Sequence, residues 1–145
     1  MAGTLEAKVD LTGGMAFNAE TGSGHSFVMD SNPDVGGAEK GPRPMEVILA
    51  ALGGCTGMDV ISILRKMRQD VTGYEVRLRG ETADEHPRVF TKITVEHVVR
   101  GRGISEDSVK RAVELSATRY CPASAMLGKT AQLNHVYRIV AEAGS

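Results

Sequence analysis

Residues 44–55 read Pro-Met-Glu-Val-Ile-Leu-Ala-Ala-Leu-Gly-Gly-Cys and open the longest apolar stretch of the chain. Proline suits the first turn of a helix, because its missing N–H would have no intrahelical partner there. The pattern predicts a helix from about Pro44 to Gln69 that is apolar on almost every side over its first turns. Such a helix must be enclosed by other protein. One small sheet cannot enclose it, so we expect a partner subunit.

Short strands are expected on both sides of this helix. Apolar and polar residues alternate with a period of two from Leu5 to Leu11, as is typical of a half-buried strand. Similar patterns predict strands at about 15–20, 25–30, 74–79, 89–99 and 136–141, and helices at about 105–120 and 122–130. The expected order is βββ-α-ββ-αα-β. We therefore predict an α+β fold in a single domain covering residues 1–145.

The second helix has a clear start. Ser105 is a favourable N-cap residue, and Glu106 and Asp107 follow it in the first turn, where the helix dipole favours acidic groups. We expect Val109, Val113 and Tyr120 to lie on its buried side.

Composition excludes several classes of protein. The chain has 145 residues, 17 Lys+Arg, 18 Asp+Glu, a formal net charge of -1 and no Trp. It lacks the basic excess of a nucleic-acid-binding protein, so we expect no nucleic-acid partner. The uncharged run from Val47 to Met58 is too short to span a bilayer, and residues 1–10 contain no apolar leader. We therefore expect no membrane association and a reducing cytoplasmic location.

The chemistry centres on two cysteines. Cys55 lies among three glycines, which disfavour a helix by roughly 1 kcal/mol each relative to alanine. These small residues fit either a helix–helix crossing, with Cys55 as a small apolar residue, or space for another backbone or a ligand to approach the thiol. Asp59 lies four residues further on the same helix face, and its charge would raise the pKa of the Cys55 thiol.

The second cysteine precedes a proline in the sequence Cys121-Pro122-Ala123-Ser124. A residue before proline avoids helical angles, so Cys121 is suited to cap the helix that follows. An ordinary turn between two helices is the alternative. The four histidines show no metal-ligand spacing, and the glycine pairs match no nucleotide motif. We therefore expect no metal and no other cofactor.

These motifs resemble those of the OsmC/Ohr family. The segment from Pro44 to Cys55 is similar to its cysteine helix, P-x-E-x-x-x-x-A-x-x-x-C, and residues 121–124 match its C-P-x-S motif. The segment Gly24–Asp30 resembles a bacterial OsmC-like branch. The resemblance covers essentially the whole chain. It implies the OsmC-like fold, with a long buried central helix, in an intertwined homodimer whose active sites lie at the subunit interface.

The resemblance also implies a thiol peroxidase used in oxidative-stress defence. Cys55 would attack an organic hydroperoxide and become a sulfenic acid, Cys121 would condense with it to a disulfide, and a dithiol reductant would restore both thiols.

The chain departs from the family at the activating groups. Met15 and Met45 stand where family peroxidases have an Arg and a Glu. Arg43 and Glu46 are the nearest candidate replacements. However, nine residues of an ideal helix place Glu46 on the face opposite Cys55. Two alternatives therefore stay open. One is a non-enzymatic protein that binds a small apolar ligand on the same dimeric scaffold, and the other is a thiol redox sensor.

Overall fold

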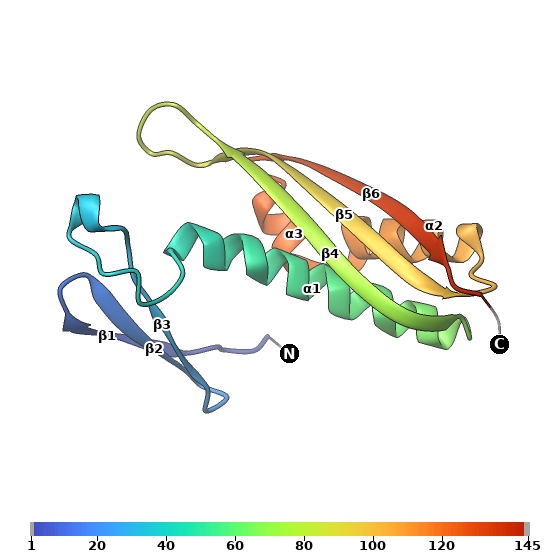
Figure 1. Cartoon of the computed structure of the whole chain (residues 1–145), viewed down its shortest axis with the longest axis horizontal. Coiled ribbons are helices and arrows are strands. Elements are labelled where there is room, and N and C mark those ends of the chain that lie inside the picture. Colours follow the sequence, from blue (N-terminus) through green and yellow to red (C-terminus); the bar gives the residue numbers. More distant parts are fainter. Residues whose placement is uncertain (1, 144–145) are drawn as a thin grey trace. The chain divides into compact units, whose positions relative to one another are not determined.

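The computed structural model describes residues 2–143, which form two compact units that divide between Ile48 and Leu49. The element order is the predicted one, with three strands, a long helix, two strands, two helices and a last strand (Figure 1). The α+β class is therefore confirmed. The single-domain assignment stays a prediction.

The first unit contains an antiparallel sheet in the order β1 (Ala7–Gly13), β2 (Ala16–Thr21) and β3 (Ser26–Met29). All three strands were predicted. Gly14, in the β1–β2 turn, has a φ of 56°, a left-handed conformation that favours glycine. Every residue of β1 is exposed in this chain, although its residues alternate between apolar and polar.

The loop after β3 is organised around one carboxylate. The Asp30 side chain is 3% exposed and accepts backbone N–H groups from Ser31, Ala38 and Lys40 at 2.7, 3.2 and 3.1 Å. These hydrogen bonds, that of Ser31 foremost, hold the pKa of Asp30 below its usual value. A short 3₁₀ turn, η1 (Pro33–Val35), lies inside the loop so formed.

Helix α1 (Pro44–Lys66) begins where the sequence indicated and ends three residues before the predicted end. By length and apolar composition alone it would pass as a membrane span. Only 28% of its most apolar window is buried within the chain, and Met58 is 74% exposed. This chain alone therefore does not enclose the helix.

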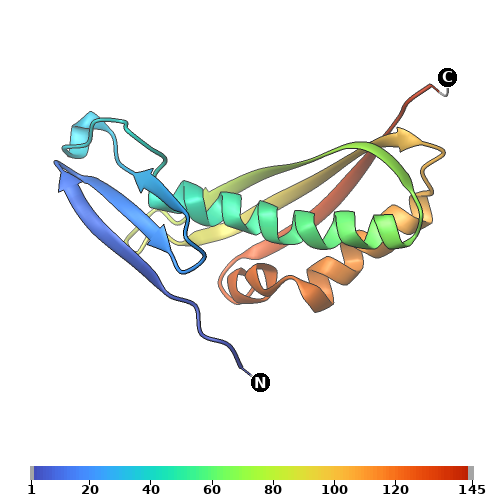
Figure 2. The same cartoon turned by 90° about the horizontal axis from the view of Figure 1, so that it is seen from below.

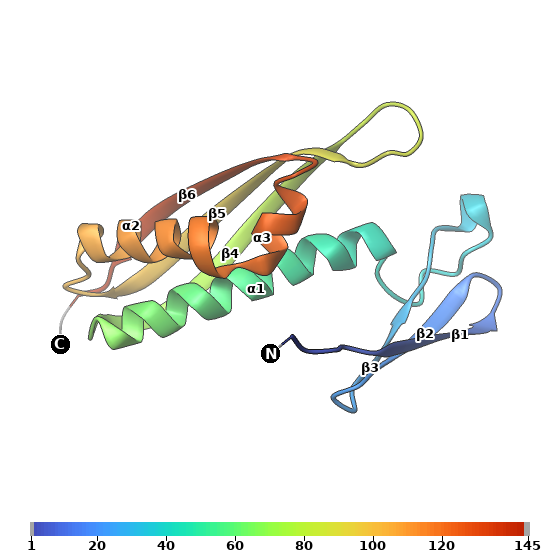
Figure 3. The same cartoon turned by 180° about the vertical axis from the view of Figure 1, so that it is seen from behind.

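The second unit is a sheet with helices on one face. Its strand order is β4 (Asp70–Thr82), β5 (Phe90–Arg102) and β6 (Gln132–Ala141). Strands β4 and β5 are antiparallel, whereas β5 and β6 are parallel. The connection from β5 to β6 consists of α2 (Glu106–Leu115), the π-helical turn η2 (Ser116–Tyr120) and α3 (Pro122–Leu127). Figures 2 and 3 show these helices beside α1 on the same face of the sheet.

Two apolar clusters join the helices to the sheet. One joins Leu52 of α1 and Ile93 and Val95 of β5 to Cys121 and Ala131. The other contains Val60 and Leu64 of α1, Val99 of β5, and Val109, Ala112 and Val113 of α2. The cysteine-bearing segments therefore belong to the core of this unit.

The start of α2 is confirmed and its predicted buried side is partly wrong. Ser105 caps the helix, with its Oγ accepting the Ser108 N–H at 3.2 Å. Val109 and Val113 are buried, but Tyr120 is 51% exposed. The chain changes to a π-helical turn at Ser116, and the wider turn rotates the following side chains away from the face that α2 buries.

Candidate active site

The two cysteines lie side by side in the second unit. Both are free thiols, Cys121 is 4% exposed and Cys55 is partly buried. The thiol groups are within hydrogen-bonding reach of each other. They come from different elements, since Cys55 lies on α1 and Cys121 lies between η2 and α3. The structure thus brings together the two residues that were predicted to have the central roles.

Cys121 occupies the predicted capping position. It is the N-cap of α3, with φ -79° and ψ 104°, and its Sγ accepts the backbone N–H of Ser124 at 3.3 Å. Pro122 provides the first residue of the helix. The Cys121 N–H is held by the Ser116 carbonyl at 2.9 Å. The π-helical turn and the proline together fix the backbone that carries this sulfur.

The surroundings of Cys55 favour the neutral thiol. Burial raises the pKa of Cys55 most, and the adjacent Cys121 and the charge of Asp59 raise it further. The Ala123 N–H, which hydrogen-bonds to the sulfur, opposes this effect. The expected influence of Asp59 is confirmed.

A polar cluster, buried except for the half-buried Asp59, joins the two cysteine segments. It consists of Thr56, Asp59 and Ser116. The Ser116 Oγ lies 2.7 Å from Thr56 Oγ1 and 2.9 Å from Asp59 Oδ2. The Asp59 carboxylate accepts a hydrogen bond from the Ser116 hydroxyl, and the oxygen of that hydroxyl can accept a hydrogen bond from the Thr56 hydroxyl. Thr56 follows Cys55 directly in the sequence, and the Ser116 carbonyl accepts a hydrogen bond from the Cys121 N–H. The cluster therefore maintains the spacing of the two sulfurs.

The glycines around Cys55 have different surroundings. A Cβ on Gly53 would lie 2.6 Å from Leu78 Cδ1, so this glycine allows β4 to pack closely on α1. A Cβ on Gly54 would meet nothing within 4 Å. At Gly53 the close neighbour is thus a strand and not the expected second helix, while Gly54 faces open space.

Arg43 and Glu46 lie together in the first unit. The Glu46 Oε1 accepts the Arg43 backbone N–H at 2.9 Å, a contact that caps the start of α1. The Arg43 guanidinium lies 2.9 Å from Glu39 Oε1 and 3.9 Å from Glu46 Oε1. Both residues thus have local partners, and their proposed catalytic roles stay predictions.

Sequence reasoning missed a partly buried hydrogen-bond chain next to the cysteines. It runs from Tyr74 through His97 and His135 to Ser124. A signal was present, because His97 shares its strand face with Ile93, Val95 and Val99 in a period-two pattern. The partners lie on other elements, and one sequence does not show that they meet. Within residues 2–143, no group of three or more His, Cys, Asp or Glu side chains could hold a metal.

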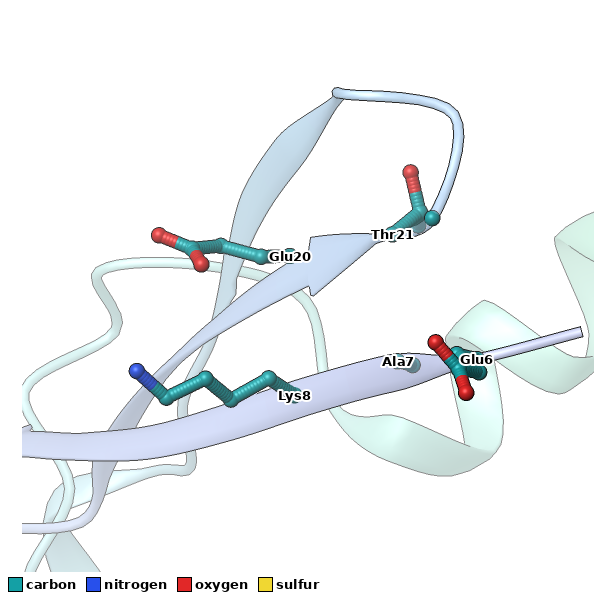
Figure 4. A pocket seen from close by; sticks show the side chains of 6 residues that line it. Glu6, Ala7, Lys8, Glu20 and Thr21 are labelled. Atoms are coloured by element: carbon teal, nitrogen blue, oxygen red, sulfur yellow. The ribbon is translucent and has the colours of Figure 1, made fainter.

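Two hollows in the first unit differ in character. One, of about 450 Å³, is lined by charged residues of both signs, among them Glu6, Lys8 and Glu20 (Figure 4). The other, of about 390 Å³, is mainly apolar and is lined by Val9, Met15, Phe17, Met29, Asp30, Ser31 and Pro44. Met15, which stands where family peroxidases would have Arg, thus contributes to an apolar surface.

Comparisons with known proteins agree with this architecture. A family model described as OsmC-like protein matches residues 36–136. Protein YhfA of Escherichia coli (strain K12) is 44% identical over 137 residues, covering 94% of this chain and 99% of that protein.

Two solved structures cover nearly the whole chain. A hypothetical protein from Aquifex aeolicus VF5 aligns with a TM-score of 0.86 at 28% identity, covering 98% of this chain and 100% of the other. An OsmC like protein from Mycoplasma pneumoniae shares the fold with a TM-score of 0.82 at 16% identity, covering 97% and 99%. With its central helix and cysteine pair in place, the chain belongs to the OsmC-like protein family.

Proposed function

We propose that this protein is a thiol-dependent peroxidase that reduces organic hydroperoxides in oxidative-stress defence. The observation that carries the proposal is the pair of free thiols, Cys55 and Cys121, held side by side in one core. A pair of this kind allows a sulfenic acid on one sulfur to be captured by the other.

The reaction proceeds in three balanced steps. The Cys55 thiolate attacks the terminal peroxide oxygen, the O–O bond breaks, and the alkoxide takes up a proton to leave as an alcohol. Cys121 then attacks the sulfur of the Cys55 sulfenic acid, and the hydroxyl group leaves as water with the Cys121 proton. A dithiol reductant finally reduces the disulfide by exchange and is itself oxidised.

Known structures of the same fold support the substrate class. Proteins described as organic hydroperoxide resistance proteins, from Elizabethkingia anophelis and Bacillus subtilis, align with TM-scores of 0.70 and 0.61. At 15% and 18% identity they share the fold with this chain. The choice of a hydroperoxide as substrate is thus our inference from the thiol pair on this fold.

Cys55 must lose its proton before it can attack the peroxide, and its raised pKa disfavours the thiolate. We propose that the protein acts as a homodimer in which Arg43 provides the cation for the Cys55 thiolate. The exposed apolar residues of α1, among them Ile48 at 42% and Met58 at 74%, support such an assembly. We also place the protein in the cytoplasm, where reducing conditions keep both thiols free.

Treatment of the reduced protein with stoichiometric cumene hydroperoxide tests the proposal. We expect both thiols to be lost within the mixing time of a manual assay, with an intact mass two hydrogens lower. Cys55→Ser should abolish the reaction. Cys121→Ser should stop at a sulfenic acid that dimedone traps. If both thiols survive a large excess of peroxide, the proposal is wrong.

A second candidate is binding of a small apolar ligand. The mainly apolar hollow lined by Met15, Phe17 and Met29 favours it. Binding without thiol chemistry would appear as displacement of a fluorescent fatty-acid probe in a protein whose thiols resist peroxide. Slow oxidation of one cysteine alone would instead indicate a redox sensor.

A further inference from the structure

A row of four polar side chains crosses the second unit beneath its helices. The Tyr74 hydroxyl of β4 lies 2.7 Å from His97 Nδ1 of β5, and His97 Nε2 lies 3.2 Å from His135 Nδ1 of β6. The His135 Nε2 lies 3.5 Å from Ser124 Oγ of α3. The rings of the two histidines stack, with centroids 5.5 Å apart. The row thus links all three strands to the helix that Cys121 caps.

Both histidines of the row are neutral at physiological pH. Burial, assisted by the neighbouring His135, lowers the pKa of His97 to about 4, and burial also lowers the pKa of His135. A neutral imidazole has one N–H donor and one acceptor nitrogen. Each histidine can therefore accept a hydrogen bond from one neighbour and donate a hydrogen bond to the next.

A single direction along the row follows once Tyr74 is taken as the donor. Burial raises the pKa of its phenol, so the hydroxyl keeps its proton and is available to donate. We assign the Tyr74 O–H as donor to His97 Nδ1. The His97 Nε2–H then donates to His135 Nδ1, and the His135 Nε2–H donates to Ser124 Oγ.

The last member of the row touches the cysteine site. Ser124 is 4% exposed, so water does not readily replace His135 as the partner of its hydroxyl. Its backbone N–H donates to Cys121 Sγ at 3.3 Å. The side chain and the backbone of this one residue therefore connect the histidine row to a sulfur.

We propose that the Tyr74–His97–His135–Ser124 row positions the resolving thiol, by holding Ser124 where its N–H stabilises negative charge on Cys121. The catalytic part of this inference rests on the proposed function. Negative charge develops on Cys121 when it loses its proton and attacks the Cys55 sulfenic acid. A backbone N–H directed at that sulfur stabilises the charge. His97 and His135 are positioning residues, and neither exchanges a proton with a sulfur.

Two substitutions of His97 form a matched pair for the test. In His97→Gln the side-chain amide reaches the position of Nε2 and keeps the contact to His135. In His97→Asn it reaches only the position of Nδ1 and keeps the contact to Tyr74. Both variants bury an amide in place of the ring, so a purely structural role of His97 would affect them alike.

Rapid mixing with cumene hydroperoxide separates the two chemical steps. We expect both variants to form the Cys55 sulfenic acid at the native rate. Disulfide formation should slow at least ~10-fold in His97→Asn, equivalent to about 1.4 kcal/mol, and stay within about twofold of native in His97→Gln. Equal slowing of resolution in the two variants, or no slowing in either, would overturn the inference.

Amide hydrogen exchange gives a readout that needs no peroxide. We expect the Ser124 amide to exchange faster in His97→Asn and at the native rate in His97→Gln, while amides in the β4–β5 pairing stay protected in both. If this pattern appears but the native protein resists peroxide, the proposed function fails and the positioning role stands. If Ser124 exchanges alike in all three proteins, the positioning role fails.

Ser124→Ala provides a smaller change should the His97 variants fail to fold. It removes the hydroxyl and keeps the backbone N–H. We expect it to slow disulfide formation as His97→Asn does, without affecting sulfenic acid formation. Resolution at the native rate in Ser124→Ala would contradict the proposal.

Discussion

The Ser116 Oγ donates a hydrogen bond to Asp59 Oδ2 over 2.9 Å and so joins the turn before Cys121 to the helix that carries Cys55. Ser116 is fully buried. The spacing of the two sulfurs therefore depends on a polar contact as well as on apolar packing.

Ser116→Ala should destabilise the protein. It leaves Asp59 and Thr56 without their buried partner, a loss of about 1–3 kcal/mol in the free energy of unfolding. Urea denaturation measures the change. Thr118→Ala, in the same turn but exposed, is the matched control and should stay within about 0.5 kcal/mol of native. Equal effects of the two substitutions would show that the Ser116 contacts contribute nothing.

Asp59→Asn should make Cys55 more reactive. The Asp59 charge is among the causes that raise the pKa of Cys55, and the amide oxygen of Asn can still accept from Ser116. Removing the charge lowers the pKa, so a larger fraction of Cys55 is thiolate at pH 8. Iodoacetamide labelling in a Cys121→Ser background measures the rate. Asp70→Asn, a surface change, should leave the rate unaltered, and slower labelling of Asp59→Asn would refute the electrostatic account.

Met58→Asp should convert a dimer into a monomer. Met58 is 74% exposed on α1, and an exposed change in a monomer alters stability by only about 0.5 kcal/mol. We expect sedimentation to give twice the chain mass for the native protein and the single-chain mass for the variant. Met126→Asp, at a residue 67% exposed on α3, should remain dimeric. A native protein that sediments as a monomer would contradict the proposed assembly.

Asp30 should make the stability of its loop depend on pH. Its folded-state pKa is lowered, so its contribution is complete above the unfolded-state pKa of about 3.9. The contribution is lost as the pH falls through the folded-state pKa. At pH 7, Asp30→Asn should speed amide exchange at Ala38 and Lys40, whereas Asp34→Asn, at an exposed position of the loop, should not. The difference between native protein and Asp30→Asn should shrink in acid, and a constant difference would contradict the linkage.

The sequence predicted those parts of the molecule that local chemistry determines. Pro44 and the apolar run placed α1, and the Cys121–Pro122 pair indicated a helix cap. Both follow from backbone preferences of neighbouring residues. The end of α1 was placed three residues too late. Gln69 bonds to the backbone of Leu64 and Met67 rather than continuing the helix.

Contacts between distant segments were beyond a single sequence. The neutral state of His97 depends on burial and on His135, which β6 brings beside it. The Thr56–Ser116 contact likewise needs the packing of η2 on α1. The exposure of Tyr120 was missed because the π-helical turn changes the helical period within one segment.

The parallel pairing of β5 and β6 has a consequence for the order in which the protein matures. Parallel strands cannot be joined by a tight turn. The connection between β5 and β6, which contains Cys121, therefore forms one long loop that closes when Val95 pairs with His135. Closing so long a loop is slow compared with forming a hairpin. Cys55 precedes this connection in the chain and Cys121 lies within it. The sheet against which both cysteine segments pack is therefore complete only when the last strand has joined it.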